Sequence, residues 1–459
     1  MIETTLVPGS AAESLRGLCG GRVFLPGDPG YDAARTPWNV AVDQRPAAVA
    51  VPTSVDEIVD VVRAAAAAGL RVVPQSTGHN AGPLAGHLDG AVLMRLSDFT
   101  GVSVDPGAGT ARIVGATLWR DVVAAAAAHG RAVMHGSSPD VAAAGYLLGG
   151  GLSWYARSHG LACNQLLAAE VVLADGSLVR ADAEHHPELF WALRGGGGNF
   201  GVVTALEIRL LPYADVYAGL LAWDGARAGE VCRAWADWTR GLAEEVTTSL
   251  RLLSVPPLPE LPEFIRGRQL VVIDGAILAS DEDARNFLLP LRALQPEIDT
   301  FSRMPVAALT GIHMDPEGPT PAVSDHLMLN TFDHAAVDVF VASAGSESGT
   351  TLLSAEIRHA GGALARPAAG GGVLDRLEAG YAGFFVAVAA TPELGAQGRS
   401  DAARVVAALQ PWSSPRRFPN FTEEEVEPDT LFGPEALARL RAVRADVDPN
   451  GVFVANHAL

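Results

Sequence analysis

The chain has 459 residues, of which 49% are hydrophobic and 19% charged, and its net charge is −19. This composition indicates a globular protein of two or three domains, and the negative charge argues against electrostatic binding to nucleic acid or an anionic membrane. No apolar run is long enough to span a membrane, and residues 1–10 lack the apolar core of a secretion signal. Cys19, Cys163 and Cys232 have neither disulfide nor zinc-site spacing, so we expect a cytoplasmic protein without a metal.

The first regular elements predict a β-α-β unit. Residues 21–26 read as a short entry strand, and residues 47–51 as the next strand. Ser54, followed three residues later by Glu57, forms a capping box that starts a helix ending at Gly69. A strand at residues 71–73 completes the unit.

A loop of small residues follows that strand: Gln75, Ser76, Thr77, Gly78, His79 and Asn80. Small residues at the end of a strand allow backbone N–H groups to converge on an anion. His79 adds an ionisable ring at the same place. The loop therefore predicts a site for a phosphate-bearing cofactor, around which the rest of the chain is organised.

The following segments alternate between strands and helices. A hairpin is expected around Asp175-Gly176, and a glycine-rich turn at residues 147–154 is expected to enter a helix. The other expected elements are strands at 91–96, 102–104, 111–114 and 202–210, and helices at 117–129 and from Pro187 to Leu193.

Gly196, Gly198 and Gly201 match the spacing of the dinucleotide-binding fingerprint. That fingerprint follows a strand and opens a helix. Here the glycines follow a predicted helix and precede a predicted strand, so we reject a nicotinamide-binding Rossmann site. Glycines in this position would instead let the backbone approach a flat ligand closely.

After Pro212 the pattern changes to alternating β segments with helices between them. Strands are predicted at 250–253, 269–277, 327–330, 352–357 and 384–389, and helices at 226–242, 281–294 and 434–447. An antiparallel sheet covered by helices is the expected arrangement, which makes the fold class α+β. We expect domains at 1–212 and 213–411, with the segment 412–459 returning to the first domain.

Several motifs resemble one family of flavoproteins. They are Ser76-Thr-Gly-His-Asn80, Gly145-Tyr-Leu-Leu-Gly-Gly-Gly151, the Asp175-Gly176 hairpin, Leu189 to Val203, Phe418-Pro-Asn-Phe421 and Asp448 to Phe453. Together they resemble the berberine bridge enzyme-like flavoproteins of the vanillyl-alcohol oxidase and p-cresol methylhydroxylase (PCMH) superfamily. The resemblance is specific in residues 20–212 and 412–459 and loose between them.

The resemblance implies FAD in a PCMH-type domain of two α/β subdomains, with a covalent 8α-histidyl bond through His79. Some members carry a second bond from a cysteine where this chain has Ser138, so we expect a single link. Many members have a tyrosine that can act as a base where this chain has Phe418. The implied FAD-binding residues are Gln75, Ser76, Thr77, Gly78, His79, Asn80, Gly136, Ser137, Ser138, Asp140, Gly145, Gly149, Gly150, Gly151, Asn199, Gly201, Val202, Val203, Asn420, Asn450 and Asn456.

The group that accepts a substrate proton must then come from elsewhere. In the predicted strand around residue 356, Glu356 and Arg358 share one face and His359 lies on the other. All three are candidates, because one face is expected to look toward the flavin; a salt-bridged sheet face is the alternative. Weaker candidates are Tyr155, Tyr381 and His313. His185 and His186 could suggest a metal site, but Pro187 and nearby acids favour a solvated helix start.

The resemblance implies an oxidase that transfers a hydride from a small-molecule alcohol, amine or benzylic carbon to flavin N5, with O2 as the electron acceptor. Two alternatives remain open: a dehydrogenase with another acceptor, and a non-redox tailoring flavoprotein. The substrate stays unspecified because specificity resides in the loosely matching residues 213–411. We expect a monomer or homodimer.

Overall fold

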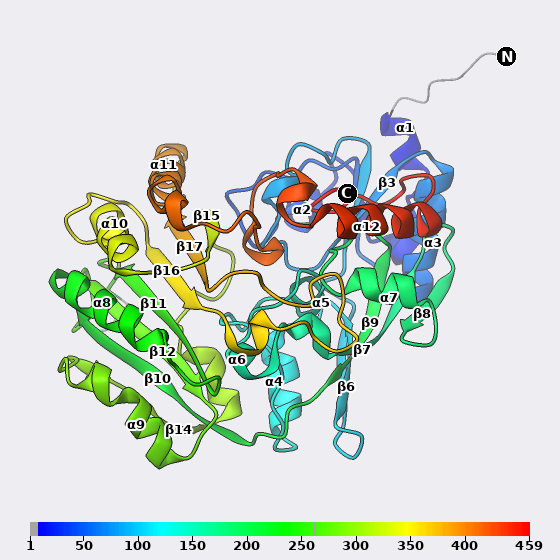
Figure 1. The fold of residues 1–459 in the computed structure, drawn as a ribbon. Coiled ribbons are helices and arrows are strands. Elements are labelled where there is room, and N and C mark those ends of the chain that lie inside the picture. Colours follow the sequence, from blue (N-terminus) through cyan, green and yellow to red (C-terminus); the bar gives the residue numbers. More distant parts are fainter. Residues whose placement is uncertain (1–7, 260–262) are drawn as a thin grey trace.

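The computed structural model describes residues 8–259 and 263–459. The first seven of residues 1–10, for which no secretion signal is expected, lie outside the described residues. The described chain has an α+β fold in which helices pack against three β-sheets (Figure 1). No helix in this part of the chain is long and apolar enough to cross a membrane.

A four-stranded sheet carries the loop at residues 75–80. Its strands lie in the order β1 (Val23–Phe24), β2 (Ala48–Ala50), β4 (Ala91–Arg95) and β3 (Arg71–Gln75). The expected β-α-β unit is present as β2, α3 (Val55–Ala67) and β3, but β4 lies between the two strands and is parallel to both. Ser54 caps α3 by accepting a hydrogen bond from the Glu57 backbone N–H.

The C-terminal end of the chain runs beside β3. Val72 N–H donates to the Val452 carbonyl (2.7 Å), and Val454 N–H donates to the Val72 carbonyl (3.0 Å). Phe453 is fully buried in the core beneath this sheet. The last residues therefore stabilise the strand that leads into the loop at residues 75–80.

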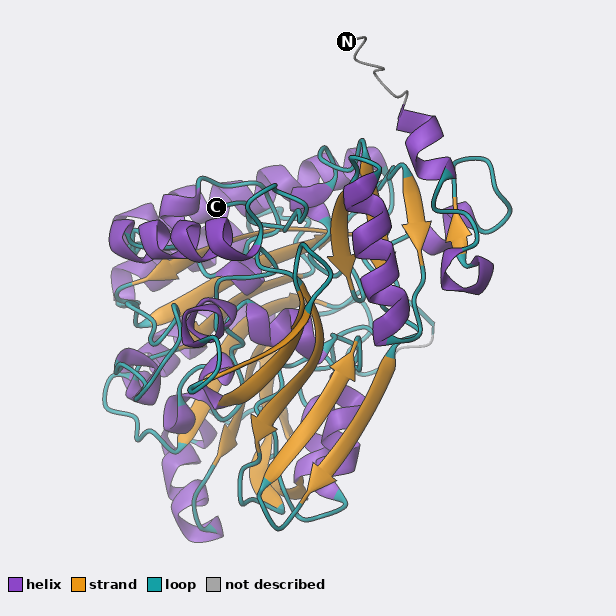
Figure 2. Cartoon of the chain, turned by 90° about the vertical axis from the view of Figure 1, so that its right-hand side faces the viewer, coloured by secondary structure: helices purple, strands orange, loops and turns teal. Residues whose placement is uncertain are grey.

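A five-stranded antiparallel sheet forms the second layer. Its strands lie in the order β5 (Thr100–Asp105), β6 (Thr110–Gly115), β9 (Val202–Arg209), β7 (Leu166–Val172) and β8 (Leu178–Asp182). The core around it includes side chains of α4 (Trp119–Ala127), α5 (Ala143–Leu148), α7 (Pro187–Leu193) and α12 (Pro434–Val447). Arg439 of α12 forms an ion pair with Glu188 of α7 (2.8 Å), and the C-terminus lies beside α12 (Figure 1). Figure 2 shows the helices packed around the strands from a second side.

Three short helices complete this part of the chain: α1 (Pro8–Glu13), α2 (Tyr31–Arg35) and α6 (Ala156–His159). The expected turn at residues 147–154 does lead into a helix, α6, but it also ends a helix that was not predicted, α5. Gly149, Gly150 and Gly151 follow the last residue of α5, and Gly150 and Gly151 have φ angles of 112° and 74°. Side chains rarely adopt these φ angles, so glycines stop the helix here.

The largest sheet consists of the eight strands β10 to β17. Its order is β13 (Ile298–Asp299), β10 (Asp215–Asp224), β12 (Gln269–Ile277), β11 (Val246–Ser254), β16 (Ser354–His359), β17 (Tyr381–Val388) and β15 (Ala322–Leu329), and β14 (Ser302–Pro305) also pairs with β10. One face packs on α8 (Ala228–Thr239), α9 (Asp281–Arg292), α10 (His334–Ala344) and α11 (Pro392–Leu409).

The two faces of this sheet have different chemistry. Leu250, Ile357 and Phe385 point into the apolar core beneath the helices. Arg251 and Glu356, which are directly opposite each other across β11 and β16, point the other way into a cavity. From these contacts we propose the expected division into residues 1–212, 213–411 and a returning segment 412–459.

Candidate active site

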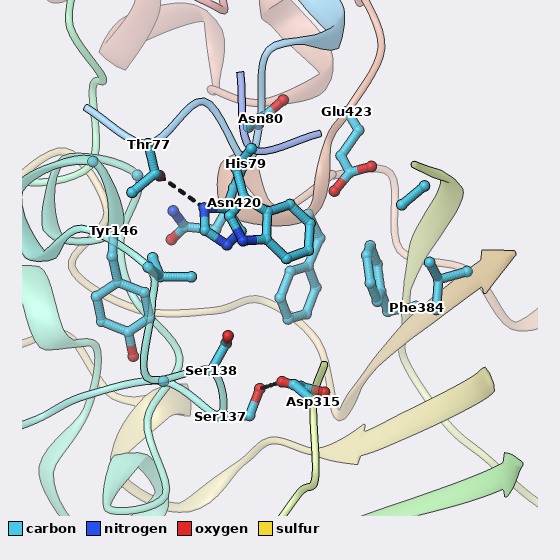
Figure 3. A pocket seen from close by; sticks show the side chains of 18 of the residues that line it. Thr77, His79, Asn80, Ser137, Ser138, Tyr146, Asp315, Phe384, Asn420 and Glu423 are labelled. Atoms are coloured by element: carbon cyan, nitrogen blue, oxygen red, sulfur yellow. Dashed lines mark hydrogen bonds between the residues drawn. The ribbon is translucent and has the colours of Figure 1, made fainter. Parts of the chain in front are cut away.

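A cavity of about 700 Å³ lies where the three sheets meet, and it is the candidate functional site (Figure 3). One side of the cavity is formed by the loop at residues 75–80 and by residues from 136–149 and 195–203. The opposite side comes from the eight-stranded sheet, including Glu356, Arg358 and Phe384. Segments at 419–423 and 456–457 line the remaining wall.

The backbone conformation and packing of the loop at residues 75–80 require a glycine at position 78. Gly78 has a φ of +80°, and a Cβ at this position would lie 2.6 Å from Pro37 Cβ. Trp38 N–H donates to the Thr77 carbonyl (2.8 Å), so the segment at 37–39 fixes the loop from outside. Only glycine fits this close approach with this backbone conformation.

His79 is held on several sides. Its ring stacks on Trp38 with a centroid distance of 4.0 Å. Its Nδ1 lies 2.7 Å from Thr77 Oγ1 (Figure 3). Its Nε2 lies 3.4 Å from Asp140 Oδ1. A ring restrained in this way keeps one orientation at the cavity wall, which suits a residue that must present one atom to a bound group.

Asp140 accepts hydrogen bonds from three segments on this side of the cavity. Its Oδ2 accepts hydrogen bonds from Trp38 Nε1 (2.7 Å) and Gly318 N–H (2.8 Å), and its Oδ1 accepts one from Ser138 Oγ (2.8 Å). Burial by itself would raise the pKa of Asp140, but the donors around it, with His79 among them, hold that pKa well below its usual range. The carboxylate is therefore ionised, accepts three hydrogen bonds and lies beside His79 Nε2.

Most of the expected cofactor residues line the cavity. These are Gln75, Ser76, Thr77, Gly78, His79, Asn80, Gly136, Ser137, Ser138, Gly145, Gly149, Gly201, Val203, Asn420 and Asn456. Gly149 leaves room for Asn420, because a Cβ there would lie 2.3 Å from Asn420 Nδ2. Gly151 N–H donates to Asn420 Oδ1 (2.7 Å), which fixes the amide at the wall.

Six expected cofactor residues do not line the cavity. Asp140 lies behind His79, and Gly150 and Gly151 pack under the wall against Phe418 and Tyr146. Asn199 bonds the carbonyls of Gly196 and His457, and Val202 points into the core on the opposite face of β9 from Val203. Asn450 was a wrong expectation, because it lies exposed in the turn after α12.

The residues around the cavity suit a large polar cofactor such as FAD. Buried atoms of four lining residues have no hydrogen-bond partner within the described residues: His79 Nε2, Asn80 Oδ1, Tyr146 OH and His457 Nδ1. Leaving such a group unpaired costs about 1–3 kcal/mol, so a ligand with matching polar atoms would bind favourably. Gly195 to Gly198 add a wall without side chains, along which a flat group can lie.

Among the described residues that line the cavity there is no cysteine. Ser138 lines it and donates to Asp140, whereas Cys163 is fully buried with its Sγ 3.5 Å from the Leu374 carbonyl. These positions support the expectation of one covalent link rather than two.

The opposite wall brings two of the three candidate catalytic residues into the cavity. Glu356 Oε1 accepts a hydrogen bond from Arg358 Nε (2.9 Å), and the Arg358 guanidinium lies 5.1 Å from the Phe421 ring centroid. Burial opposes the charge on Arg358, but Glu356 and neighbouring carboxylates raise the pKa of Arg358 above its usual value. Arg358 therefore remains charged on the cavity wall, where it donates to Glu356.

His359 was the third candidate, and the structure places it outside the cavity. It lies on the core side of β16, stacked on Tyr381 at 5.3 Å, and its Nε2 lies 3.1 Å from Arg157 Nη1. Burial, with the charge of Arg157, lowers the pKa of His359 to about 3. The weaker candidates Tyr155 and Tyr381 do not line the cavity either, whereas His313 does.

Phe418, which stands where many family members have a tyrosine, does not lie in the cavity. Phe418 is buried outside this cavity, where its backbone N–H donates to His326 Nε2 (2.9 Å). Phe421 lies in the cavity instead, with its ring centroid 5.0 Å from that of Phe384. Either way this wall presents an aromatic ring without a hydroxyl group.

Sequence reasoning missed Arg251 and Asp274, which join His313 and Glu356 in one cluster. Arg251 Nη2 lies 2.6 Å from Asp274 Oδ2, and His313 Nδ1 lies 2.8 Å from the same oxygen. His313 Nε2 lies 3.5 Å from Glu356 Oε1. A signal was present, because Asp274 is a charged residue inside an otherwise apolar strand, β12.

The two remaining histidines of interest lie at a helix start. His186 is the residue before α7, with a φ of 48°, and His185 Nδ1 lies 2.9 Å from Asp182 Oδ1. Both are exposed, and neither lines the cavity.

Comparisons with known proteins agree with this geometry. A family described as an FAD binding domain matches residues 46–182. (R)-6-hydroxynicotine oxidase of Paenarthrobacter nicotinovorans is 36% identical over a segment that covers 44% of this chain and 44% of that protein. The aligned part is therefore less than half of that relative's length.

Two further similarities extend along almost the whole chain. Chitooligosaccharide oxidase of Gibberella zeae is 26% identical over 91% of this chain and 88% of that protein. The solved structure of Physcomitrella patens BBE-like 1 superposes with a TM-score of 0.85 at 19% identity, covering 98% of each chain. The comparisons together show an FAD-binding domain at residues 46–182 and a fold shared with berberine bridge enzyme-like proteins, which is consistent with an FAD-linked oxidoreductase.

Proposed function

We propose that the chain is an FAD-dependent oxidase that takes a hydride from an alcohol, amine or benzylic carbon of a small molecule, with O2 as the electron acceptor. One observation carries the proposal: a single cavity has a restrained histidine on one side and an ionised cluster on the other. The names of two relatives, a 6-hydroxynicotine oxidase and a chitooligosaccharide oxidase, support the oxidase assignment.

Different residues of the chain would bind the cofactor and contact the substrate. The loop at residues 75–80, the glycines at 195–198 and Asn420 would hold FAD, which supplies a two-electron acceptor when bound. Glu356 and Arg358 would contact the substrate on the facing wall. Leu253, Val255 and Phe384 add apolar surface there and exclude water from the reacting groups.

We also propose that His79 carries FAD covalently. The support is the fixed ring of His79 at the cavity wall and the absence of a cysteine among the described lining residues. Protein precipitated with acid should keep its yellow colour, and His79→Ala should release the flavin into the supernatant. Ser138→Ala and Cys163→Ser are matched controls that should retain it. Flavin that stays attached in His79→Ala would contradict a single link through this residue.

The activity test separates the oxidase from its alternatives. Anaerobic flavin bleaching is measured against a panel of sugars, phenolic alcohols and cyclic amines, and O2 is then mixed in by stopped flow. Bleaching followed by fast reoxidation supports an oxidase, and bleaching with slow reoxidation supports a dehydrogenase with another acceptor. A flavin that no member of a broad panel reduces would favour a non-redox tailoring protein.

Two further expectations accompany the proposal. The three cysteines, Cys19, Cys163 and Cys232, are all buried and free, which supports a reducing compartment such as the cytoplasm. A monomer or homodimer is expected, and light scattering of the purified protein measures it.

A further inference from the structure

A fully buried carboxylate lies directly beneath the cavity. Asp274, in the middle of β12, has no exposed surface, and it accepts hydrogen bonds from Ser249, Arg251 and His313. Burial by itself would raise the pKa of Asp274, but Arg251 and His313 hold it well below its usual range. Asp274 is therefore an ionised group that can only accept hydrogen bonds.

This carboxylate determines which nitrogen of His313 carries hydrogen. His313 Nδ1 lies 2.8 Å from Asp274 Oδ2, and because an ionised carboxylate only accepts, Nδ1 must donate. The neutral ring then has its lone pair on Nε2. The backbone of His313 is fixed as well, since its carbonyl accepts from Arg251 Nη1 (2.8 Å).

The unprotonated nitrogen faces groups that would stabilise a proton on it. His313 lines the cavity, and its Nε2 lies 3.5 Å from Glu356 Oε1 and 3.8 Å from Asp315 Oδ1. The Trp154 ring packs edge-on at 5.6 Å. An imidazolium ion formed here would have carboxylates next to both nitrogens, from Asp274 on one side and from Glu356 and Asp315 on the other.

Glu356 is less suited to be the first proton acceptor. Its Oε1 already accepts from Arg358 Nε, and that guanidinium is held in place over the Phe421 ring. A nearby cation favours the ionised form of a carboxylate and so opposes its protonation. Glu356 thus acts better as a partner for a charged His313 than as the base itself.

We propose that His313 Nε2 accepts the proton from the substrate O–H or N–H, and that Asp274 is the positioning residue that keeps His313 in the required tautomer. The inference rests on the proposed flavin-dependent oxidation. The O–H or N–H bond breaks, its electron pair becomes the new double bond to carbon, and the proton forms an N–H bond at Nε2. The hydride and its two electrons leave the same carbon to the FAD, so the substrate is oxidised by two electrons.

The first experiment needs no substrate. Nitrogen NMR of isotopically labelled histidines in the FAD-loaded protein reports which ring nitrogen of His313 is protonated, and the signal is assigned by its loss in His313→Gln. The expected result is hydrogen on Nδ1 in the neutral ring. In Asp274→Asn an amide N–H can donate to Nδ1, so the hydrogen should move to Nε2. Hydrogen on Nε2 in the wild-type neutral ring would overturn the proposal.

The second experiment uses any compound that bleaches the flavin. Positioned bases typically contribute 10²–10⁴-fold, so His313→Gln and Asp274→Asn should each slow flavin reduction by roughly that factor while the flavin spectrum is retained. His159→Gln is the matched control, because His159 bonds Tyr213 OH away from the cavity.

The outcomes separate this inference from the proposed function. Reduction of His313→Gln at the wild-type rate would refute the role of His313 and leave the oxidase intact. A panel without any reducing compound would count against the oxidase, while the NMR result would still decide whether Asp274 fixes the tautomer. If Asp274→Asn does not fold, the wild-type tautomer and His313→Gln still test the proposal.

Discussion

Replacement of Asp140 tests whether one buried carboxylate holds the His79 side of the cavity together. Asp140 is 3% exposed and accepts from Trp38 Nε1, Gly318 N–H and Ser138 Oγ. In Asp140→Ala, Trp38 Nε1–H and the Gly318 N–H lose their acceptor at a buried position. At about 1–3 kcal/mol for each unsatisfied group, the free energy of unfolding should fall by about 2–6 kcal/mol.

The amide variant gives a graded comparison. Asp140→Asn keeps the shape, but only one of its two terminal atoms accepts hydrogen bonds. It should therefore lose about half as much stability as Asp140→Ala, about 1–3 kcal/mol by the same reasoning. Urea unfolding followed by tryptophan fluorescence measures both variants, and the surface substitution Asp338→Asn, at an exposed ion pair with Arg233, is the control.

The pH dependence of this effect has a defined sign. The pKa of Asp140 is lower in the folded protein than its ordinary value of 3.8, so its ionised form stabilises the fold above about pH 4. That stabilisation should be lost as the pH falls below about 4. The difference between wild type and Asp140→Asn should therefore shrink on acidification. A difference that stays constant from pH 7 to pH 3, or an Asp140→Ala variant as stable as wild type, would refute this account of Asp140.

Three other substitutions probe separate features. Gly78→Ala would force a side chain at φ +80° against Pro37, so we expect most of the FAD content to be lost, as measured by flavin absorbance per protein. Phe385→Ala removes a fully buried ring from the core of the largest sheet and should cost about 3–5 kcal/mol in urea unfolding. Burial raises the pKa of Glu423 to about 7 from 4.5, so the wild type should lose stability as pH rises through about 7. Glu423→Gln should therefore gain in melting temperature relative to wild type between pH 5 and pH 8, and an unchanged difference would contradict this.

Local patterns in the sequence were sufficient for most elements. The capping box at Ser54 begins α3, Pro187 begins α7, and β12 spans residues 269–277 as expected. These features depend on interactions between residues a few positions apart, which the sequence displays directly. Several elements had no prediction, among them β10 and the helices α10 and α11.

Some residues of the candidate site could likewise be predicted from local sequence, whereas others depended on the packing. The loop at residues 75–80 could be predicted because its small residues and His79 are contiguous. The alternation in β16 separated Glu356 and Arg358 from His359, but alternation is symmetrical and does not say which face is inside. Only the packing of α8, α10 and α11 on the His359 side decided that Glu356 and Arg358 enter the cavity.

What the sequence by itself determined is the α+β class, the cofactor loop and most element positions, because each depends on short-range spacing. What the tertiary structure decided is the cluster of Arg251, Asp274, His313 and Glu356, which brings together three strands and a loop spread over more than a hundred residues. A buried ionised group is stable only when distant partners surround it. Such partners can be identified only once the sheet order places β12, β11 and β16 side by side.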